Sequence, residues 1–382
     1  MGGSPSMVRF VHTADWQIGM PARFLPEETA VRFASARLEA LVRLGRLARE
    51  QACAFVLVCG DAFDSNLVSR RTVHQVRQAL ADMGLPVYIL PGNHDALDPA
   101  TVYAKADFLH SLPAAVHVLG TAGVVEAAAG VEIVAAPWAS KRPTEDLAGA
   151  ACRSLPRAPD GTLRILAAHG AVDVWNVGGG VLPPATIRLA VLEQALSGGV
   201  VHYVALGDRH STTPVGRTGR VWYPGAPEVT AFDEVDSGQA LIVELGAGTC
   251  AVRPVRVGRW RFLAHRHDVT GAAGVESLEG WLEGLPDKAE TVVRLEVDGT
   301  VDLEEDARLA ALVERFADVL GGLQLAGTGV AVLPSTADLD RLTLGGFAAS
   351  ALAELRRHAE APGGAVALDA LKLAFRLEAT RP

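Results

Sequence analysis

Cysteine is scarce in this chain of 382 residues. The four cysteines stand far apart, and no two of them form a C-x-x-C pair: Cys53, Cys59, Cys152 and Cys250. Disulfide frameworks and zinc ribbons both need cysteines at close, regular spacing. We therefore expect neither feature, and we expect the reducing environment of the cytoplasm.

Long hydrophobic runs are also missing. No stretch of eighteen apolar residues occurs without charges or turn signals, which argues against a transmembrane helix and a membrane partner. No basic segment followed by an apolar signal opens the chain. Residues 1–6, ahead of Met7, are expected to be a remnant of cloning that lies outside the fold.

Basic charge is in short supply as well. Lys and Arg total 35 against 44 Asp and Glu, so the formal net charge is −9. The acidic excess is C-terminal: residues 1–259 carry 23 basic and 24 acidic side chains, whereas residues 260–382 carry 12 and 20. Nonspecific DNA affinity depends on the phosphates that Lys and Arg neutralise. A DNA-directed protein of this composition therefore needs a partner or a dimer, or its substrate is small.

Five short polar motifs stand out, each at the end of an apolar run. The runs cover residues 8–11, 55–59, 87–90, 163–168 and 200–206, and their Val, Leu and Ile content predicts strands buried on both faces. The motifs that follow them are Asp15-Trp16-Gln17, Gly60-Asp61-Ala62-Phe63-Asp64, Gly92-Asn93-His94-Asp95, His169-Gly170 and Gly207-Asp208-Arg209-His210. Because open α/β sheets present ligand residues at the carboxyl ends of their strands, we expect the motifs to converge on one cleft.

The residue types in these motifs suit divalent metal ions. Carboxylate and carboxamide oxygens and neutral imidazole nitrogens are the usual ligands, and one carboxylate can bridge two ions. Two such ions, roughly 3.5–4 Å apart, activate a water and stabilise the attacking and leaving oxygens of an in-line displacement at phosphorus. The motifs therefore predict phosphoester hydrolysis.

The order of the motifs resembles that of the calcineurin-like metallophosphoesterases. Within that family, the chain is most similar to the SbcD-type exonuclease subunits of double-strand-break repair. That closer resemblance rests on His12-Thr13-Ala14-Asp15, Gly60-Asp61-Ala62-Phe63-Asp64-Ser65, Leu90-Pro91-Gly92-Asn93-His94-Asp95 and Tyr223-Pro224-Gly225-Ala226-Pro227-Glu228. It covers about residues 7–260 and implies two sheets packed face to face with flanking helices.

The resemblance also implies a ligand set for two ions. One ion is held by Asp15, Gln17, Asp61 and His210, and the other by Asp61, Asn93, His169 and Asp208, with Asp61 as the bridge. His94 then serves as the general acid or charge stabiliser on the leaving side, and Asp95 orients its ring by a hydrogen bond.

Two positions depart from the usual nuclease pattern, since Gln17 and Asp208 each replace an expected His. The resulting oxygen-rich site should favour Mn²⁺, with Mg²⁺ or Fe²⁺ as alternatives, over Zn²⁺. A decayed site on a scaffold remains a second interpretation, although Gln and Asp can both still coordinate. Arg209 is a candidate for contact with substrate phosphates, whereas the Arg70-Arg71 pair is better explained as solvated surface.

The chain is expected to form an α/β protein with two domains. Residues 7–259 are assigned to a metallophosphoesterase β-sandwich flanked by helices, in which strands at 221–223, 240–245 and 251–257 pair antiparallel in a second sheet. Residues 260–382 are assigned to a C-terminal α+β cap or partner-docking domain. Its last two amphipathic helices, at 346–359 and 365–377, suit either a packed cap or a docking hairpin.

The function that we expect is that of a cytoplasmic, metal-dependent DNA nuclease. The resemblance implies an SbcD-like subunit in DNA repair or DNA end processing, with DNA and an SbcC-like ATPase of the SMC family as partners, and a homodimer is a further expectation. Two alternatives stay open: a small-molecule phosphodiesterase or phosphatase with the same site, and a non-catalytic scaffold for the ATPase.

Overall fold

The chain divides into two compact units, Met1–Trp260 and Arg261–Pro382. The structure is a computed structural model, and it describes residues 7–109, 112–175, 180–333, 347–359, 361 and 364–379. The residues 1–6 that we assigned to a cloning remnant lie outside this range. None of the helices within the described residues is both long and apolar enough to span a membrane.

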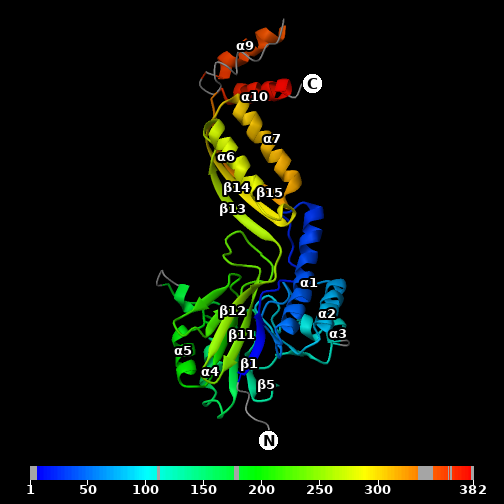
Figure 1. Cartoon of the computed structure of the whole chain (residues 1–382), viewed down its shortest axis with the longest axis vertical. Helices are drawn as coiled ribbons and strands as arrows, with labels where there is room; N and C mark the ends of the chain where they lie inside the picture. Colours follow the sequence, from blue (N-terminus) through cyan, green and yellow to red (C-terminus); the bar gives the residue numbers. More distant parts are fainter. Residues whose placement is uncertain are drawn as a thin grey trace. The chain divides into compact units, whose positions relative to one another are not determined.

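The first unit contains two six-stranded sheets (Figure 1). The first sheet has the order β12-β11-β1-β2-β3-β4. Its four parallel strands are β1 (Met7–Thr13), β2 (Val56–Cys59), β3 (Val87–Leu90) and β4 (Val116–Val118). On the other side of β1 the sheet is antiparallel, with β11 (Gln239–Gly246) and β12 (Cys250–Arg256).

The second sheet has the order β5-β6-β7-β8-β10-β9. Its strands are β5 (Gly123–Ala128), β6 (Val131–Ala136), β7 (Leu163–His169), β8 (Tyr203–Gly207), β10 (Val221–Tyr223) and β9 (Thr213–Val215). Four neighbouring strands run parallel, namely β6, β7, β8 and β10. The edge strands β5 and β9 are antiparallel to their neighbours.

Side chains alternate between the two faces of each sheet, as strand geometry requires. On β1 and β2, Val11, Val56 and Val58 pack with the helices α1 (Glu27–Glu50) and α2 (Arg70–Met83). Phe10 and Phe55 point the other way, stack at 5.0 Å between ring centroids, and fill the core with residues of the second sheet.

Helices α4 (Leu147–Arg153) and α5 (Leu189–Ser197) pack on the outer face of the second sheet. Shorter helical elements lie in the connections between strands: η1 (Val102–Ala104) and α3 (Ala106–Leu109) come between β3 and β4, and η2 (Asp173–Trp175) comes between β7 and α5. The expected α/β sandwich with flanking helices is therefore confirmed.

One strand assignment was wrong. The segments at 221–223, 240–245 and 251–257 do not share a second sheet: β10 pairs with β8, whereas β11 and β12 extend the first sheet beside β1. Leu241, Val243 and Leu245 of β11 are buried between the two sheets. A local hydrophobic pattern predicts a strand but not its partner, because the pattern is satisfied on either side of one core.

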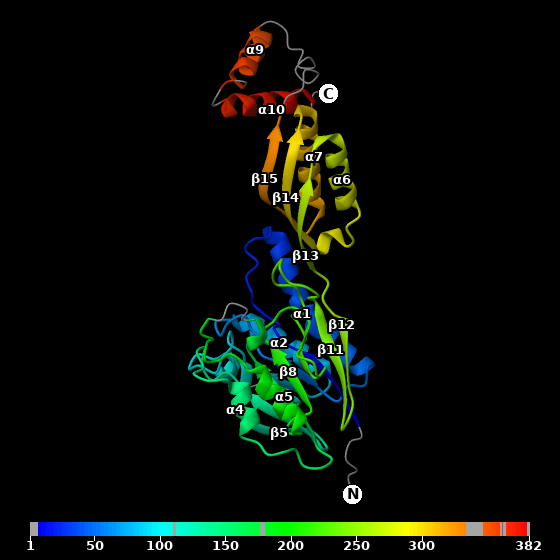
Figure 2. The same cartoon turned by 90° about the vertical axis from the view of Figure 1, so that its left-hand side faces the viewer.

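The second unit is a parallel three-stranded sheet with helices on one face (Figure 2). Strands β13 (Arg261–Asp268), β14 (Thr291–Val301) and β15 (Gly322–Val332) alternate with α6 (Gly271–Glu283), η3 (Lys288–Glu290) and α7 (Leu303–Val319). Helices α9 (Phe347–Ala359) and α10 (Ala365–Ala379) follow. Leu352 and Leu371 of these helices are buried in the same core as Phe316, while Val366 and Leu373 are exposed.

Candidate metal centre

The predicted ligand residues meet where strands of both sheets end. Asp15 and Asp61 follow β1 and β2 of the first sheet, and Asn93 follows β3. His169 ends β7 of the second sheet, and Asp208 follows β8. The site therefore draws on both layers of the sandwich, and the carboxyl ends of parallel strands bring together residues far apart in the sequence.

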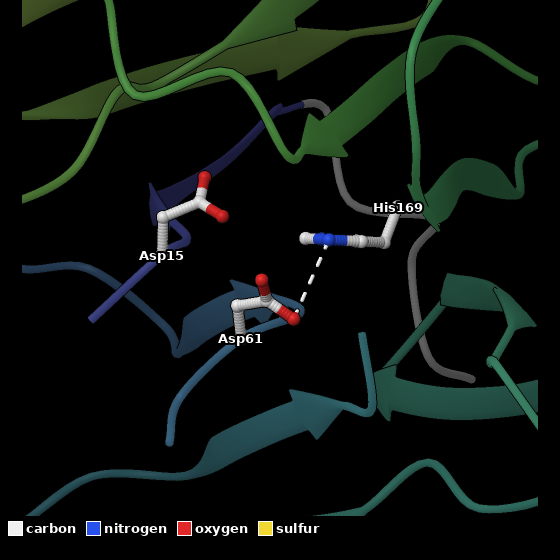
Figure 3. A group of neighbouring side chains, drawn as sticks. All are labelled: Asp15, Asp61 and His169. Carbon is white, nitrogen blue, oxygen red and sulfur yellow. Dashed lines mark ion pairs between the residues drawn. The ribbon is translucent and has the colours of Figure 1, made fainter. Parts of the chain in front are cut away.

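Three buried side chains form the centre of the site (Figure 3). One ligand atom from each of Asp15, Asp61 and His169 lies within 4.8 Å of the other two. The His169 Nε2 atom is 3.5 Å from Asp61 Oδ1, and all three residues are almost fully buried. A single divalent ion could bind between such groups.

His169 presents its Nε2 atom to the other predicted ligands of the second ion. Its Nδ1 atom lies 2.8 Å from the carbonyl oxygen of Cys59, to which it donates a hydrogen bond. Its Nε2 atom lies 2.7 Å from Asn93 Oδ1 and 3.7 Å from Asp208 Oδ1. A backbone acceptor at one ring nitrogen is the usual way to orient a metal-binding imidazole.

His210 is held in the same manner on the other side. Its Nε2 atom is 3.8 Å from Asp15 Oδ1, and its Nδ1 atom lies 2.5 Å from Thr230 Oγ1 and 3.2 Å from Glu234 Oε1. Gln17 completes this side, since its amide nitrogen donates to Asp61 Oδ2 at 3.1 Å. Each of the seven predicted ligand residues thus contacts another member of the set.

The backbone at the site is locally strained. Asp15, Gln17, Asp61 and Asp208 have positive φ angles of 52°, 49°, 52° and 106°. Such conformations cost about 1–3 kcal/mol each and persist where the surrounding structure imposes them, often at functional sites. Asp is among the residue types that tolerate this region best. The strain places four of the seven predicted ligands in conformations that local preference alone would not select.

A glycine before Asp61, the predicted bridging carboxylate, permits the close approach of His169. Gly60 has a φ angle of +90°, and a Cβ atom at this position would lie 2.1 Å from His169 Nδ1. Any larger residue would therefore displace the imidazole or the strand end. Glycine at this position combines the two requirements of a positive φ and an absent side chain.

The electrostatics of the site fit divalent cations. Burial raises the pKa of Asp15 to about 7, against the opposing effect of His169 and His210. Burial by itself would lower the pKa of His169, but the carboxylates of Asp61, Asp15 and Asp208 outweigh it and raise that pKa to about 9. No Lys or Arg in the described part of the chain forms an ion pair with Asp15 or Asp61. Buried carboxylates need a compensating positive charge, and metal ions can supply it.

His94 lies at the rim of this cluster. Its backbone N–H donates to Asp61 Oδ1 at 2.9 Å, and its Nε2 atom is 4.0 Å from Asp61 Oδ2. The ring Nδ1 lies 2.8 Å from the carbonyl oxygen of Asp64. The imidazole is therefore oriented by a backbone carbonyl, with Nε2 facing the site.

The expectation that Asp95 orients this ring by a hydrogen bond was wrong. The Asp95 carboxylate accepts hydrogen bonds from the N–H groups of Gly92 and Phe63, at 2.7 and 3.2 Å, and from the Tyr103 hydroxyl at 2.6 Å. Burial raises its pKa to about 6. Asp95 is turned into the protein, where it holds together the loops after β2 and β3.

Arg209 and Arg70 have different surroundings. Arg209 stacks on Trp175, with the guanidinium carbon 4.5 Å from the ring centroid, and donates from Nε to Thr213 Oγ1 at 2.9 Å. Arg70 is largely exposed and forms an ion pair with Asp107 at 3.0 Å, as expected of a surface residue. Only Arg209 stands among the predicted metal ligands.

Sequence reasoning missed Glu234, Thr230, Tyr103 and Trp175. Glu234 accepts hydrogen bonds from the backbone N–H groups of Thr230 and Ala231 and faces His210. It follows its partner His210 by 24 positions, so no local motif identifies it. A buried carboxylate beside a metal-binding imidazole is a common supporting arrangement, but it becomes visible only in three dimensions.

Several solved structures are similar to this chain at low sequence identity. Among curated proteins, none matches this chain. Similar solved structures include TT1561 of Thermus thermophilus, with 12% identity, 66% of this chain and 99% of that chain covered, and a TM-score of 0.40. A dimetal phosphatase from Danio rerio has 12% identity, coverage of 64% and 98%, and a TM-score of 0.38. The purple acid phosphatase PPD1 from yellow lupin (Lupinus luteus) seeds has 15% identity, coverage of 68% and 53%, and a TM-score of 0.38.

The family itself is shown by a match to the sequence. The family model described as calcineurin-like phosphoesterase matches residues 8–238, which is more than half of the chain and includes every predicted ligand residue. Five strand-end motifs and the cluster of Asp15, Asp61 and His169 agree with that match. The chain belongs to the calcineurin-like phosphoesterase family and is a metal-dependent phosphoester hydrolase.

Proposed function

We propose that this phosphoesterase is a DNA nuclease of the SbcD type that uses Mn²⁺. The observation that carries the proposal is that the predicted ligands at the centre of the site are buried, whereas side chains at its edge are partly exposed. Asp15 is fully buried, whereas the side chains of Asp208, His210 and His94 are 32%, 29% and 45% exposed. A phosphodiester within a polymer can reach a site that is open in this way. The motifs at 12–15, 60–65, 90–95 and 223–228 support DNA as that polymer.

The residues divide into two ligand groups around Asp61. Asp15, Gln17, Asp61 and His210 would hold one ion, and Asp61, Asn93, His169 and Asp208 the other. When bound, the ions supply Lewis acidity and an activated water for displacement at phosphorus. Five of the seven side chains offer oxygen, which favours Mn²⁺, Mg²⁺ or Fe²⁺ over Zn²⁺.

In this proposal His94 donates a proton to the leaving oxygen. Donation from its Nδ1–H to the carbonyl of Asp64 leaves Nε2 as the atom that faces the site. A charged His94 ring carries a proton on Nε2, which it can transfer to the leaving oxygen of the broken ester. The backbone hydrogen bond from His94 to Asp61 keeps this donor in register with the bridging carboxylate.

An additional partner is part of the proposal. The net charge of −9 gives the chain little capacity to bind DNA by charge alone. An SbcC-like ATPase of the SMC family would supply DNA-binding surface and act with the second unit, and a homodimer would add a second nuclease site. The resemblance, together with the acidic composition, is the support for these partners.

The test is Mn²⁺-dependent cleavage of end-labelled single- and double-stranded DNA by the full chain, with bound metal quantified. Asp61→Ala should lose metal and cleavage together, and Asp160→Ala, a change at an exposed position, should behave like the wild type. Cleavage of a chromogenic phosphodiester without cleavage of DNA would identify a small-molecule phosphodiesterase instead. Failure to bind metal would favour the non-catalytic scaffold.

A further inference from the structure

Trp175 is an exposed aromatic side chain beside the candidate metal centre. It ends η2, in the segment that follows β7, and exposes 40% of its surface, whereas Trp16, Tyr203 and Tyr223 are fully buried. An indole left in water forgoes the stabilisation that its burial would give. Its exposure beside the candidate metal centre leaves indole surface available to a ligand.

Two contacts tie Trp175 to the residues of the site. Its ring lies against Tyr223 at 5.8 Å between centroids, and the Tyr223 hydroxyl donates to the carbonyl oxygen of Gly170 at 2.7 Å. Gly170 directly follows His169. The other contact is Arg209, whose guanidinium carbon is 4.5 Å from the indole centroid and whose chain neighbours are Asp208 and His210. The indole is thus supported by residues adjacent to three predicted ligands.

Arg209 is held in place by one hydrogen bond and a ring contact, and its terminal nitrogens can still donate to a ligand. Its Nε–H donates to Thr213 Oγ1 at 2.9 Å, which fixes the plane of the guanidinium over the indole. Among the residues that the structure describes, neither terminal nitrogen of Arg209 has a hydrogen-bond partner. A planar guanidinium with free N–H groups is suited to bind phosphate oxygens.

We propose that Trp175 and Arg209 form a nucleotide subsite, in which the indole stacks on a base next to the scissile phosphodiester and Arg209 contacts a flanking phosphate. The inference rests on the proposed nuclease function and adds a substrate preference to it. Stacking tolerates any base, because every base has a π face. A base must leave its duplex to stack on protein, so the subsite favours single-stranded or frayed ends.

The test compares an oligothymidine with an oligonucleotide of the same length that carries abasic sites. Base stacking on an aromatic residue contributes enough that its loss should raise KM about tenfold. With the wild type, KM should be about tenfold higher for the abasic oligonucleotide. Trp175→Ala should raise KM for oligothymidine by a similar factor, and the two changes together should raise it no further. Trp175→Phe should return KM for oligothymidine most of the way to the wild-type value, since phenylalanine keeps an aromatic face.

A neighbouring residue provides the matched control. Val174 lies in the same short turn and is 45% exposed, so Val174→Ala should leave KM for both oligonucleotides unchanged. Equal KM values of the wild type for the two oligonucleotides would overturn the proposal. A rise in KM with Val174→Ala equal to that with Trp175→Ala would also overturn it.

A binding measurement distinguishes failure of this inference from failure of the nuclease proposal. If the wild type cleaves no DNA, fluorescence anisotropy with labelled oligothymidine and its abasic counterpart still reports stacking. A tenfold preference for oligothymidine that Trp175→Ala abolishes would keep the subsite while the nuclease proposal falls. Equal affinity for the two oligonucleotides would reject the subsite.

Discussion

Gln17 donates a hydrogen bond from its side-chain amide to the carboxylate of Asp61, at 3.1 Å. The amide nitrogen thus orients the residue predicted to bridge both ions. The amide oxygen of Gln17 remains available as a neutral ligand for a metal. A His is expected at this position from the resemblance, and it would offer nitrogen instead. The Gln17–Asp61 pair is therefore one of two places, with Asp208, where the metal preference of this chain should differ from the usual nuclease pattern.

Replacing Gln17 should change that preference. Gln17→His exchanges an oxygen ligand for a borderline-soft nitrogen, so the affinity for Zn²⁺ relative to Mg²⁺ should rise about tenfold. Competition titrations against a metal-sensitive dye would measure the ratio. Gln17→Ala is the control, since it should weaken binding of both metals. An unchanged ratio in Gln17→His would show that Gln17 does not coordinate.

His94→Ala should separate metal binding from turnover. Because the His94 side chain lies at the rim, and the hydrogen bond to Asp61 comes from its backbone N–H while its Nε2 atom is 4.0 Å from that carboxylate, both ions should remain bound. Loss of a general acid typically lowers kcat by about 10²–10⁴-fold. Metal content and single-turnover cleavage would be measured on the same sample. His117→Ala, on an exposed histidine that stacks on Tyr88, is the matched control. Near wild-type turnover in His94→Ala would exclude the proposed role.

Glu234→Gln should weaken the ion held by His210. The carboxylate lies 3.2 Å from His210 Nδ1, and loss of such a supporting carboxylate typically costs about 10–100-fold in metal affinity or activity. Isothermal titration with Mn²⁺ should show one weakened site and one unchanged site. Asp233→Asn removes a charge from the neighbouring exposed residue and should change neither. Equal weakening of both sites would show that Glu234 acts on the site as a whole.

Metal binding should release protons. Burial raises the pKa of Asp15 to about 7, and nearby carboxylates, against the opposing effect of burial, raise that of His169 to about 9. In the metal-free chain at pH 7, His169 is protonated and Asp15 is partly protonated, whereas a metal needs both groups deprotonated. Roughly one to two protons should leave on binding.

The sign of the pH dependence follows from that competition. Apparent metal affinity should fall as pH drops below about 9, and more steeply below about 7. Titration calorimetry in buffers of different ionisation enthalpy would count the protons released at each pH. A binding enthalpy that is independent of the buffer at pH 7 would contradict the expectation.

Gly60→Ala should disrupt the site more than an equivalent change elsewhere. Gly60 and Gly84 both have positive φ angles, but an added Cβ would lie 2.1 Å from His169 Nδ1 at Gly60, whereas at Gly84 its nearest contact would be the Arg49 side chain at 4.0 Å. Gly84→Ala should cost about 1–2 kcal/mol in the free energy of unfolding and keep its metal. Gly60→Ala should cost more and lose metal. Denaturant unfolding with metal analysis would compare them, and full metal content in Gly60→Ala would refute the close-approach argument.

Much of the site could be predicted because its signals are local. Each ligand motif follows directly on an apolar run, and a strand that ends at the edge of a parallel sheet presents its next residues there. That rule places Asp15 beside Asp61, because the two residues follow neighbouring strands of one sheet. His169 ends a strand of the other sheet, and its place beside them was implied by the resemblance. The start of α2 depends on equally local chemistry, since the Ser69 hydroxyl accepts a hydrogen bond from the N–H of Thr72 as a helix N-cap.

Tertiary structure decided which side chains support the ligands. Glu234 reaches His210 from 24 positions along the chain, and Tyr223 of β10 supports Trp175 of η2. The Asp95 carboxylate does not bond to the neighbouring His94 ring, because it accepts hydrogen bonds from two buried N–H groups and the Tyr103 hydroxyl. The sequence determined the strands and the ligand residues, since these depend on short-range hydrophobic pattern and residue chemistry. The partners of β11, His94 and Trp175 come from segments far away in the sequence that the fold brings together, and no local pattern encodes that.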